Sequence, residues 1–413
     1  MVKVLPKNLE DNIRIIDFNS NEEFKKFLLE DIKVDQRSIK FFERKNKIFY
    51  IYLRNIEAQF CNIIKQEMLS CGGDAAVSSD VSRFIKKNSN ILIFGNYKNI
   101  EQFIEKSKYQ IKPIAEIGKK ISEIISNYEK VPNLKINKKK FDFKNKIYIM
   151  GILNITPDSF YDGGKYFDRE IAIERAFKLV EEGADIIDIG GQSTRPGSDE
   201  IPVEEELKRV LPVLKAIRKK VKVLISVDTY KSAVALEALK EGADIINDIS
   251  GLKFDKNMAK IISKYNAGVV IMHIKGTPKT MQINPEYDSL ISEIIQYLNE
   301  SIKIAIENGI DYDKIIIDPG IGFGKSLEDN YIIINKLKEF KIFNRPILIG
   351  LSRKSLIGKV LNQQPHQRLL GTILLNAISI LNGANIIRVH DVKEHKEMIK
   401  LLSFLNTEGL YYK

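Results

Sequence analysis

From Lys146 onward, short apolar runs alternate with longer amphipathic stretches. Stretches such as Ile171–Glu182 and Glu205–Lys219 carry apolar residues three or four positions apart, which predicts helices that bury one face. The short runs between them are rich in Ile and Val, which predicts strands covered on both faces. The predicted strands are Ile147–Leu153, Asp185–Ile189, Val221–Val227, Asp244–Ile249, Gly268–Met272, Ile315–Ile317, Ile347–Ile349 and Asn385–Val389.

These eight strands and the helices between them occupy residues 146–413. A closed (β/α)₈ barrel typically takes about 250 residues, so we expect an α/β fold with a TIM barrel over this range. A doubly wound open sheet is the structural alternative, although it would not require eight equally short strands. In a barrel, functional side chains should gather where the strands end.

Residues 1–130 are expected to form a separate, smaller α/β domain. The predicted strands are Lys47–Leu53 and Ile91–Phe94, and the predicted helices are Glu22–Leu29, Asn55–Leu69 and Ile100–Lys106. Residues 131–145 follow, with lysines that include positions 135, 138, 139 and 140, and this composition is typical of an exposed linker.

The N-terminal domain carries no motif that defines its role. Cys61 and Cys71 are too few for a disulfide framework or a four-cysteine zinc site. We expect reduced structural thiols there, with a reactive or metal-binding pair as the alternative. Our hypothesis for residues 1–130 is a docking or dimer-organising module.

The charge of the chain is unevenly distributed. The 65 Lys and Arg residues against 54 Asp and Glu give a formal charge of +11, which would ordinarily suggest a nucleic-acid partner. Residues 1–150 hold 29 of the basic and 19 of the acidic residues, so residues 151–413 are nearly neutral. We therefore expect no nucleic-acid partner for the barrel.

The apolar residues indicate no membrane segment. There is no apolar run of about 18 residues, the length that a membrane span requires. The first ten residues also lack the apolar core of a signal peptide. We expect a cytoplasmic protein without a membrane partner.

Polar residues stand at nearly every predicted strand end, which packing alone does not explain because buried polar groups cost several kcal/mol unless they are paired. Each could have a structural role by itself, such as a helix cap for Asp228 or Asp318, or a hydrogen-bonded structural histidine for His390. Together on one barrel face they indicate a functional site. The strand-end residues include Asn154, Thr194, Arg195, Asp228, Asn247, His273, Asp318, Lys354, Arg388 and His390.

These strand-end residues fall into two chemical sets. Arg388 and His390 lie two positions apart and therefore face the same side of the last strand. With Asn154, Thr194 and Arg195 they form a cationic, hydrogen-bonding corner that suits a phosphate or pyrophosphate. The second set is Asp228, Asn247, Asp318 and Lys354, which fits the amidine-like edge of an aminopyrimidine ring. Together they describe a site for a nitrogen heterocycle with a pyrophosphate tail.

Six motifs resemble those of the dihydropteroate synthase family, in the family's order over about residues 146–405. They are Gly151–Gly164 (GILNITPDSFYDGG), Gly190–Gly197 (GGQSTRPG), Ser226–Lys231 (SVDTYK), Asp318–Gly324 (DPGIGFG), Ser352–Ser355 (SRKS) and Arg388–Val392 (RVHDV). Position 192 is Gln where Glu is expected in many members. The two side chains are near-isosteres, so this difference leaves the resemblance intact.

The resemblance implies an enzyme that condenses 6-hydroxymethyl-7,8-dihydropterin pyrophosphate with p-aminobenzoate to give 7,8-dihydropteroate and pyrophosphate for folate synthesis. It places Asp228, Asn247, Met272, Asp318 and Lys354 at the pterin. It places Asn154, Thr194, Arg195, Arg388 and His390 at the pyrophosphate, with the cofactor Mg²⁺ near Asn154. It places Thr194, Pro196, Phe323, Lys354 and Ser355 at the p-aminobenzoate.

The resemblance also implies catalytic roles for Asp228, Lys354, Arg388 and His390, inhibition by sulfonamides, and a homodimer. The loops over 154–166 and 191–199 would close over the substrates. No Ser-His-Asp or Cys-His pair is apparent, so we expect ionisation of the pterin substrate before substitution, with stabilisation of the departing charge. Water would compete for the cation, which gives the closing loops a reason to exclude it.

Two alternatives remain at this point. A barrel that transfers a methyl group from methyltetrahydrofolate to a corrinoid would share the pterin-holding Asp and Asn residues. It would have little use for the Thr194–Arg195 pair or for the SRKS and RVHDV motifs. A catalytically silent pterin-binding protein is the other alternative, and the complete anion corner argues against it.

Overall fold

The computed structural model describes residues 20–83, 85–155, 165–195 and 197–405, together with residue 14 and residues 16–18. The chain divides into two compact units, the first ending at Ser126 and the second running from Asn127 to Leu410. Within the described ranges, every helix is too short or too polar to cross a bilayer.

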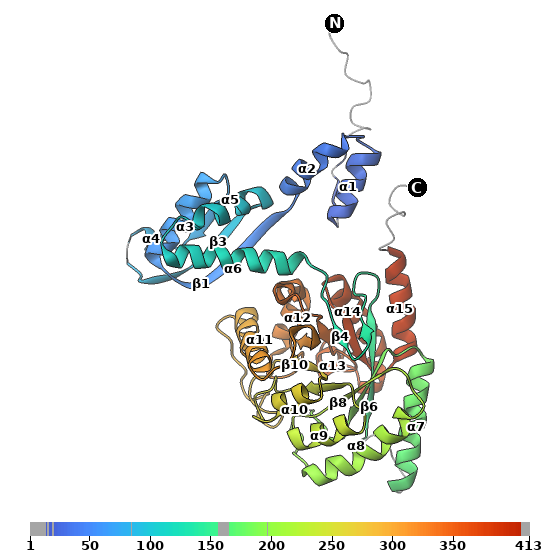
Figure 1. Ribbon diagram of the computed structural model, residues 1–413. Coiled ribbons are helices and arrows are strands. Elements are labelled where there is room, and N and C mark those ends of the chain that lie inside the picture. The colour runs from blue at the N-terminus through green and yellow to red at the C-terminus, as the bar shows by residue number, and fades with distance from the viewer. Residues whose placement is uncertain are drawn as a thin grey trace. The chain divides into compact units, whose positions relative to one another are not determined.

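The first unit is built on a three-stranded antiparallel sheet in the order β1-β3-β2 (Figure 1). Its elements are α1 (Asn21–Glu30), α2 (Ile39–Asn46), β1 (Ile48–Glu57), α3 (Ala58–Ser70), β2 (Asp74–Val77), α4 (Ser79–Ser82), β3 (Asn88–Asn96), α5 (Tyr97–Ser107) and α6 (Lys112–Glu129), the last of which runs into the second unit. Phe49, Ile91 and Ile93 belong to one buried core with residues of α3, α5 and α6.

The two strands predicted in this unit are confirmed, and both are longer than predicted. The predicted helix from Asn55 begins at Ala58 instead, because Asn55 adopts a φ of +55° where the register shifts between Leu53 and Ile56. Strand β2 was not predicted, since its four residues are too few to show a period. Cys61 and Cys71 are buried free thiols, in agreement with the structural role expected of them.

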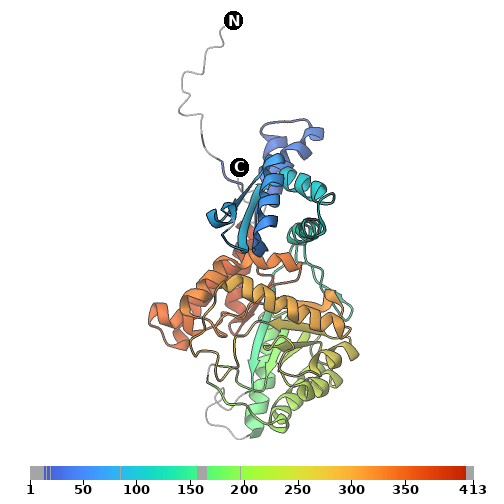
Figure 2. The ribbon, with the colours of Figure 1, turned by 90° about the vertical axis from the view of Figure 1, so that its left-hand side faces the viewer.

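The second unit is a (β/α)₈ barrel, which confirms the predicted fold. Its parallel strands follow the order β11-β10-β9-β8-β7-β6-β13-β12, and a bridge between Ile317 and Ile347 joins the two ends into a ring. Figures 1 and 2 show the helices surrounding these strands. The open-sheet alternative is therefore wrong.

The strands of the barrel are β6 (Tyr148–Asn154), β7 (Ile186–Gly190), β8 (Leu224–Asp228), β9 (Ile245–Asp248), β10 (Gly268–Met272), β11 (Ile315–Asp318), β12 (Leu348–Ile349) and β13 (Ile386–Val389). The helices are α7 (Lys165–Glu181), α8 (Val203–Arg218), α9 (Ser232–Lys240), α10 (Met258–Lys264), α11 (Leu290–Glu307), α12 (Leu327–Asn335), α13 (Ser355–Leu361), α14 (Leu369–Leu381) and α15 (Val392–Leu405). All eight strands lie within three residues of their predicted ranges.

The interior of the barrel changes from apolar to polar along most of its strands. Side chains two positions apart face the same way, so Ile186 is followed inside by Asp188, and Leu224 by Ser226 and Asp228. The same step gives Ile245 then Asn247, Ile316 then Asp318, and Ile386 then Arg388. The apolar layer forms the floor of the barrel, and the polar layer above it forms the site.

Residues 131–145 were predicted to be an exposed linker, and that prediction is wrong. They form a hairpin of β4 (Lys135–Ile136) and β5 (Lys139–Lys140) that closes the bottom of the barrel. The apolar residues between the lysines are buried against the barrel floor: Leu134, Ile136, Phe141 and Phe143. The prediction of a linker came from the lysine content of this segment, whereas its structure is determined by the apolar side chains at alternating positions.

The opposite ends of two strands carry carboxylates with a structural role. Asp185 accepts a hydrogen bond from the Ile149 amide at 3.0 Å, and Asp244 accepts one from the Ile225 amide at 2.8 Å. The glycines before them, Gly183 and Gly242, have φ values of +104° and +95°, which end the preceding helices in the left-handed region. These two connections, residues 183–185 and 242–244, therefore join each helix to the next strand and lie away from the polar layer.

Candidate active site

A half-buried arginine and two buried carboxylates form the centre of the polar layer. The Arg388 guanidinium donates from Nε to Asp188 at 2.6 Å and from Nη2 to Asp228 at 2.7 Å. The Asn247 amide donates to the same oxygen of Asp188 at 3.1 Å. Strand pairing causes this arrangement, because Asp228 and Asn247 are partners in register on neighbouring strands.

Each carboxylate keeps one oxygen available. Among the described residues, Asp188 Oδ1 and Asp228 Oδ1 are buried and receive no hydrogen bond. A buried acceptor without a donor is costly, so such atoms indicate a ligand that brings N–H or O–H groups. Burial raises the pKa of Asp228 to about 7, Arg388 opposes this rise, and the neighbouring Asp188 adds to it. Asp228 can therefore exchange a proton near neutral pH.

Lys354 and Asp318 form the next part of the polar layer. The Lys354 ammonium donates to the Ile321 carbonyl and lies 4.8 Å from the centre of the Phe323 ring. Burial lowers the pKa of Lys354 to about 8, and the charge of Asp318 opposes that change. Burial raises the pKa of Asp318, whereas Lys354 lowers it. The charge of each group thus opposes the shift that burial causes in the pKa of the other.

The turn after β11 has a conformation that requires glycine. Asp318 accepts a hydrogen bond from the Gly320 amide at 2.7 Å, and Gly320 has a φ of +72°. A Cβ atom at this position would lie 1.9 Å from the His273 carbonyl oxygen. The turn therefore fixes Asp318 at the strand end and brings Phe323 beside Lys354.

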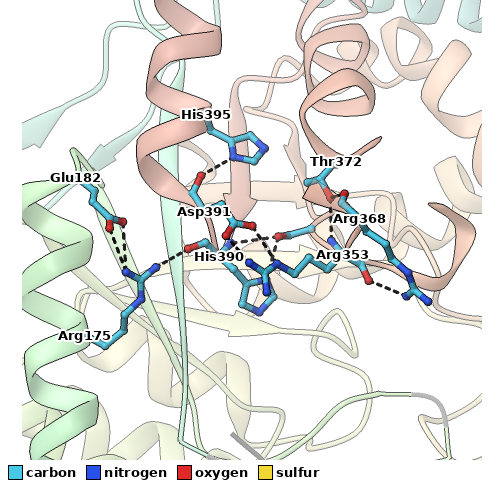
Figure 3. Close-up of polar contacts among 9 residues, drawn as sticks. Arg175, Glu182, Arg353, Arg368, Thr372, His390, Asp391 and His395 are labelled. Atoms are coloured by element: carbon cyan, nitrogen blue, oxygen red, sulfur yellow. Dashed lines mark hydrogen bonds and ion pairs between the residues drawn. The ribbon is translucent and has the colours of Figure 1, made fainter. Parts of the chain in front are cut away.

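His390 is held in place by contacts around its backbone and its ring. Its amide donates to Ser352 Oγ at 3.2 Å, and its Nδ1 lies 2.9 Å from the same oxygen. Arg175 from α7 donates to the His390 carbonyl at 2.7 Å, as Figure 3 shows. Burial lowers the pKa of His390 to about 4, and the nearby charges of Arg388 and Arg353 contribute. The imidazole is therefore neutral near pH 7, so the positive charge of this corner belongs to its arginines.

A bidentate ion pair between Arg353 and Asp391 supports the turn that carries His390. Arg353, at a φ of +57°, donates to both oxygens of Asp391 at 3.0 and 2.5 Å. Its amide donates to Thr372, and its carbonyl accepts from Arg368 (Figure 3). This network connects the turn that carries Lys354 to the turn that carries His390. Both turns are thereby fixed before any substrate arrives.

The remaining predicted residues lie around this centre. Asn154 ends β6 in register with Gly190, which is itself in register with Asp228. Met272 is buried and in register with Asp318. Thr194 is half-buried and Arg195 is exposed in the loop after β7, and the Arg195 charge contributes to the lowered pKa of His390.

Three further parts of the predicted site remain: Ser355, the loop residues and Arg388. Ser355 is exposed at the first position of α13. Pro196 and residues 156–164 of the first closing loop lie outside the described residues. Arg388 lies between the two predicted sets, since its guanidinium bonds the carboxylates on the heterocycle side.

Asp188 is the central residue that the sequence analysis missed. It is the only charged residue inside the apolar run Ile186–Gly190, and it lies two positions before Gly190 on the same face. A charge inside a fully apolar strand is a usable signal, because it must be paired. Ser352, Asp391 and Arg175 were also missed as supports of His390, since their partners are remote in sequence.

The described residues contain no group of three or more His, Cys, Asp or Glu side chains that could hold a metal ion. Asn154 offers one amide oxygen at the edge of the site. Mg²⁺ commonly keeps several waters and binds through one or two protein oxygens together with substrate phosphates. The residues present therefore fit Mg²⁺ that is held mainly by a pyrophosphate, and they do not fit a closed protein cage.

Comparisons with known proteins agree with this geometry. Residues 150–390 match the family model described as pterin binding enzyme. The dihydropteroate synthase of Clostridium beijerinckii is 44% identical over 273 residues, which cover 66% of this chain and 99% of that protein.

Solved structures show the same likeness. A dihydropteroate synthase from Clostridium difficile, in the presence of pteroic acid, is 46% identical with a TM-score of 0.61 and covers 64% of this chain and 99% of its own. The Yersinia pestis dihydropteroate synthase in a sulfonamide drug complex is 41% identical with a TM-score of 0.64, covering 67% and 99%. The relatives align with the barrel unit and carry the synthase name, which favours a synthase over the methyltransferase alternative.

Proposed function

Because this chain belongs to the pterin-binding enzymes and its barrel is that of a dihydropteroate synthase, we propose that it joins a dihydropterin pyrophosphate to p-aminobenzoate by ionisation before substitution. The observation that carries the proposal is the half-buried Arg388 between two buried carboxylates, each with one oxygen that no described residue bonds. That set can bind a donor-rich heterocycle and place a positive charge beside it.

The heterocycle would bind in the polar layer. The N–H groups of an aminopyrimidine edge would donate to the available oxygens of Asp188 and Asp228 and to Asp318. The Asn247 amide and the Lys354 ammonium would supply donors to the ring's acceptor atoms, above Met272. Burial of these groups makes each hydrogen bond stronger than it would be in water.

The pyrophosphate would lie on the side of Arg195, Thr194, Asn154 and His390. A neutral imidazole can donate one hydrogen bond to a phosphate oxygen without repelling Arg388. Mg²⁺ held by Asn154 and the substrate oxygens would neutralise charge that develops on the departing group. The positive charge of Arg195, which is exposed in its loop, suits an anion that enters from solvent.

In the reaction, the bond from the pterin methylene carbon to the pyrophosphate oxygen breaks and the electron pair leaves with pyrophosphate. The aniline nitrogen then forms the new C–N bond and loses one proton. The carboxylate of Asp228 would favour the positive charge on the pterin between these two events. The p-aminobenzoate would approach between Phe323, Lys354 and Ser355, with Thr194 and Pro196 on the loop side.

The test is an assay of the full chain with both substrates and Mg²⁺. We expect dihydropteroate and pyrophosphate in equal amounts, and competitive inhibition by a sulfonamide against p-aminobenzoate. A protein that binds the pterin substrate but forms neither product would be the silent binding protein, and this result would refute the proposal. If p-aminobenzoate is omitted, slow release of pyrophosphate with formation of the hydroxymethyl pterin would support ionisation first.

We also propose a homodimer, as the resemblance implies. Light scattering during size-exclusion chromatography should then give twice the chain mass of 47.3 kDa. A mass of one chain at micromolar concentration would refute this state.

A further inference from the structure

A buried lysine outside the reaction centre anchors the loop after β7. This loop, residues 191–202, carries Thr194 and Arg195. The anchor is Lys231, which follows β8 and is 8% exposed. Its ammonium donates to Gln192 Oε1 at 2.6 Å, to Glu206 Oε2 at 3.0 Å and to the Ile201 carbonyl. All three donors of the ammonium are therefore used, and all three partners belong to the loop or to the helix that follows it.

The three partners include residues near both ends of the loop. Gln192 lies near its start and Ile201 near its end, and the Ile201 amide also donates to Gln192 Oε1 at 3.4 Å. The Gln192 amide nitrogen donates to the Tyr230 hydroxyl at 2.7 Å, which fixes the orientation of its side chain. One ammonium thus holds both ends of the loop together.

The charges of the cluster balance because position 192 is Gln. Glu206 is 1% exposed, and Lys231 is the cation that pairs with it, while Glu200 lies 3.8 Å away at the exposed rim. A buried ammonium is stable only with a buried negative partner and full hydrogen bonding. Gln192 supplies an acceptor without adding a second buried negative charge.

The end of the loop has little packing on its outer side. A hollow of about 440 Å³ lies there, lined by Glu200, Ile201, Pro202, Val203, Lys231, Ala233 and Asp255. This space could accept movement of residues 200–203, and the hydrogen bonds of Ile201 to Lys231 and Gln192 restrain that movement. The segment further along has its own contacts. Ser198 Oγ donates to the carbonyls of Ser193 and Arg195, the Gly197 amide donates to the Pro278 carbonyl at 3.0 Å, and Lys279 forms an exposed ion pair with Asp199.

We propose that Lys231 is a positioning residue of the reaction, which holds Thr194 and Arg195 where p-aminobenzoate and the pyrophosphate group bind. This inference rests on the proposed function. Lys231 acts through Gln192 and Ile201, and its ammonium is fully engaged by the loop and by Glu206. Its loss should therefore weaken binding of p-aminobenzoate and leave the pterin pocket unchanged.

The test compares Lys231→Met, Lys231→Arg and the double variant Lys231→Met/Glu206→Gln in the full chain. The double variant removes the buried charge that the single variant would leave unpaired, so it separates loop positioning from misfolding. The control is Lys240→Met, which removes an exposed lysine at the end of α9, the helix that begins directly after Lys231. Melting temperature, steady-state kinetics and binding of a pterin analogue by calorimetry are measured for each.

We expect the double variant to melt close to the parent and to bind the pterin analogue within about twofold of it. Its KM for p-aminobenzoate should rise about tenfold, which corresponds to about 1.4 kcal/mol. Lys231→Arg should restore part of this loss, and Lys240→Met should behave as the parent. An unchanged KM in a folded double variant would overturn the proposal, as would a pterin affinity that falls in parallel.

Hydrogen exchange provides a readout that does not depend on activity. Amides of residues 193–201 should exchange faster in the double variant than in the parent, whereas those of β8 and α9 should not change. Equal exchange in the loop would overturn the anchoring role, even if the chain is an active synthase. Faster exchange in a chain that forms no dihydropteroate would support the anchor and refute the proposed function.

Discussion

The hairpin that closes the bottom of the barrel can be tested with one substitution, Ile136→Ala. Ile136 is fully buried, and its Cδ1 packs so closely on β10 that a Cβ on Gly268 would come within 2.7 Å of it. Truncation of a buried Ile to Ala typically costs about 2–5 kcal/mol through lost transfer energy and the remaining cavity. The rigid backbone of β10 limits collapse of the cavity, so we expect about 3 kcal/mol.

The matched control is Lys135→Ala, at the neighbouring exposed position of the same strand. A surface substitution of this kind should change the free energy of unfolding by less than about 0.5 kcal/mol. Unfolding in urea is followed by far-UV circular dichroism and by synthase activity, since activity reports on the barrel unit alone. With an m-value of about 3 kcal/mol/M, the midpoint of activity loss should fall by about 1 M for Ile136→Ala.

The result that would refute this reasoning is an equal midpoint for Ile136→Ala and Lys135→Ala. Residues 131–145 would then be the exposed linker that their composition suggests, and the barrel floor would be stable without them. A shift seen by circular dichroism but not by activity would also refute it, because the lost stability would lie outside the barrel.

Three further predictions concern the site. Arg388→Ala should lower kcat at least about 100-fold, because it removes the charge beside the reacting carbon and leaves two buried carboxylates unpaired. The rate of product formation measures this, and a kcat within tenfold of the parent would contradict the role assigned to Arg388. Asp391→Asn weakens the bidentate pair with Arg353 and should lower kcat about tenfold with little change in melting temperature, and unchanged kcat would show that the pair does not position His390. Because the pKa of Asp228 is raised to about 7 and the reaction needs its carboxylate, kcat/KM should rise between pH 6 and 8, and Asp228→Asn should abolish this rise. The same pKa shift should make the folded chain less stable as pH rises. The folded chain holds the Asp228 proton more tightly than the unfolded chain, so protonated Asp228 adds to the free energy of unfolding below about pH 4, and this addition is lost as pH rises through 7.

Most of the barrel followed from the sequence because its signals are local. Strand ranges came from short apolar runs, and the site came from polar residues at their ends, which a closed parallel barrel must bring to one face. Asp228 and Asn247 were predicted to act together, and they are partners in register on neighbouring strands. The motifs identified the family and favoured a synthase over the methyltransferase, and the names of the relatives agree with that choice.

Other features could not be predicted because they depend on partners remote in sequence. Asp188 appeared as one residue of a strand, yet its charge is paired with Arg388, 200 positions away. His390 was predicted at the pyrophosphate without a protonation state, and its burial beside two arginines lowers its pKa to about 4. The pKa of such a group depends on three-dimensional surroundings that no local pattern contains.

The sequence by itself determined the number and order of the strands and which residues stand at their ends, because hydrophobic periodicity and strand-end polarity are properties of neighbouring residues. Only the tertiary structure decided that a lysine-rich segment closes the barrel floor and that Arg388 bridges two carboxylates. It also decided that Lys231 ties the two ends of a loop. These features arise from packing and electrostatics between distant segments, where burial and pairing set the energy of each charge.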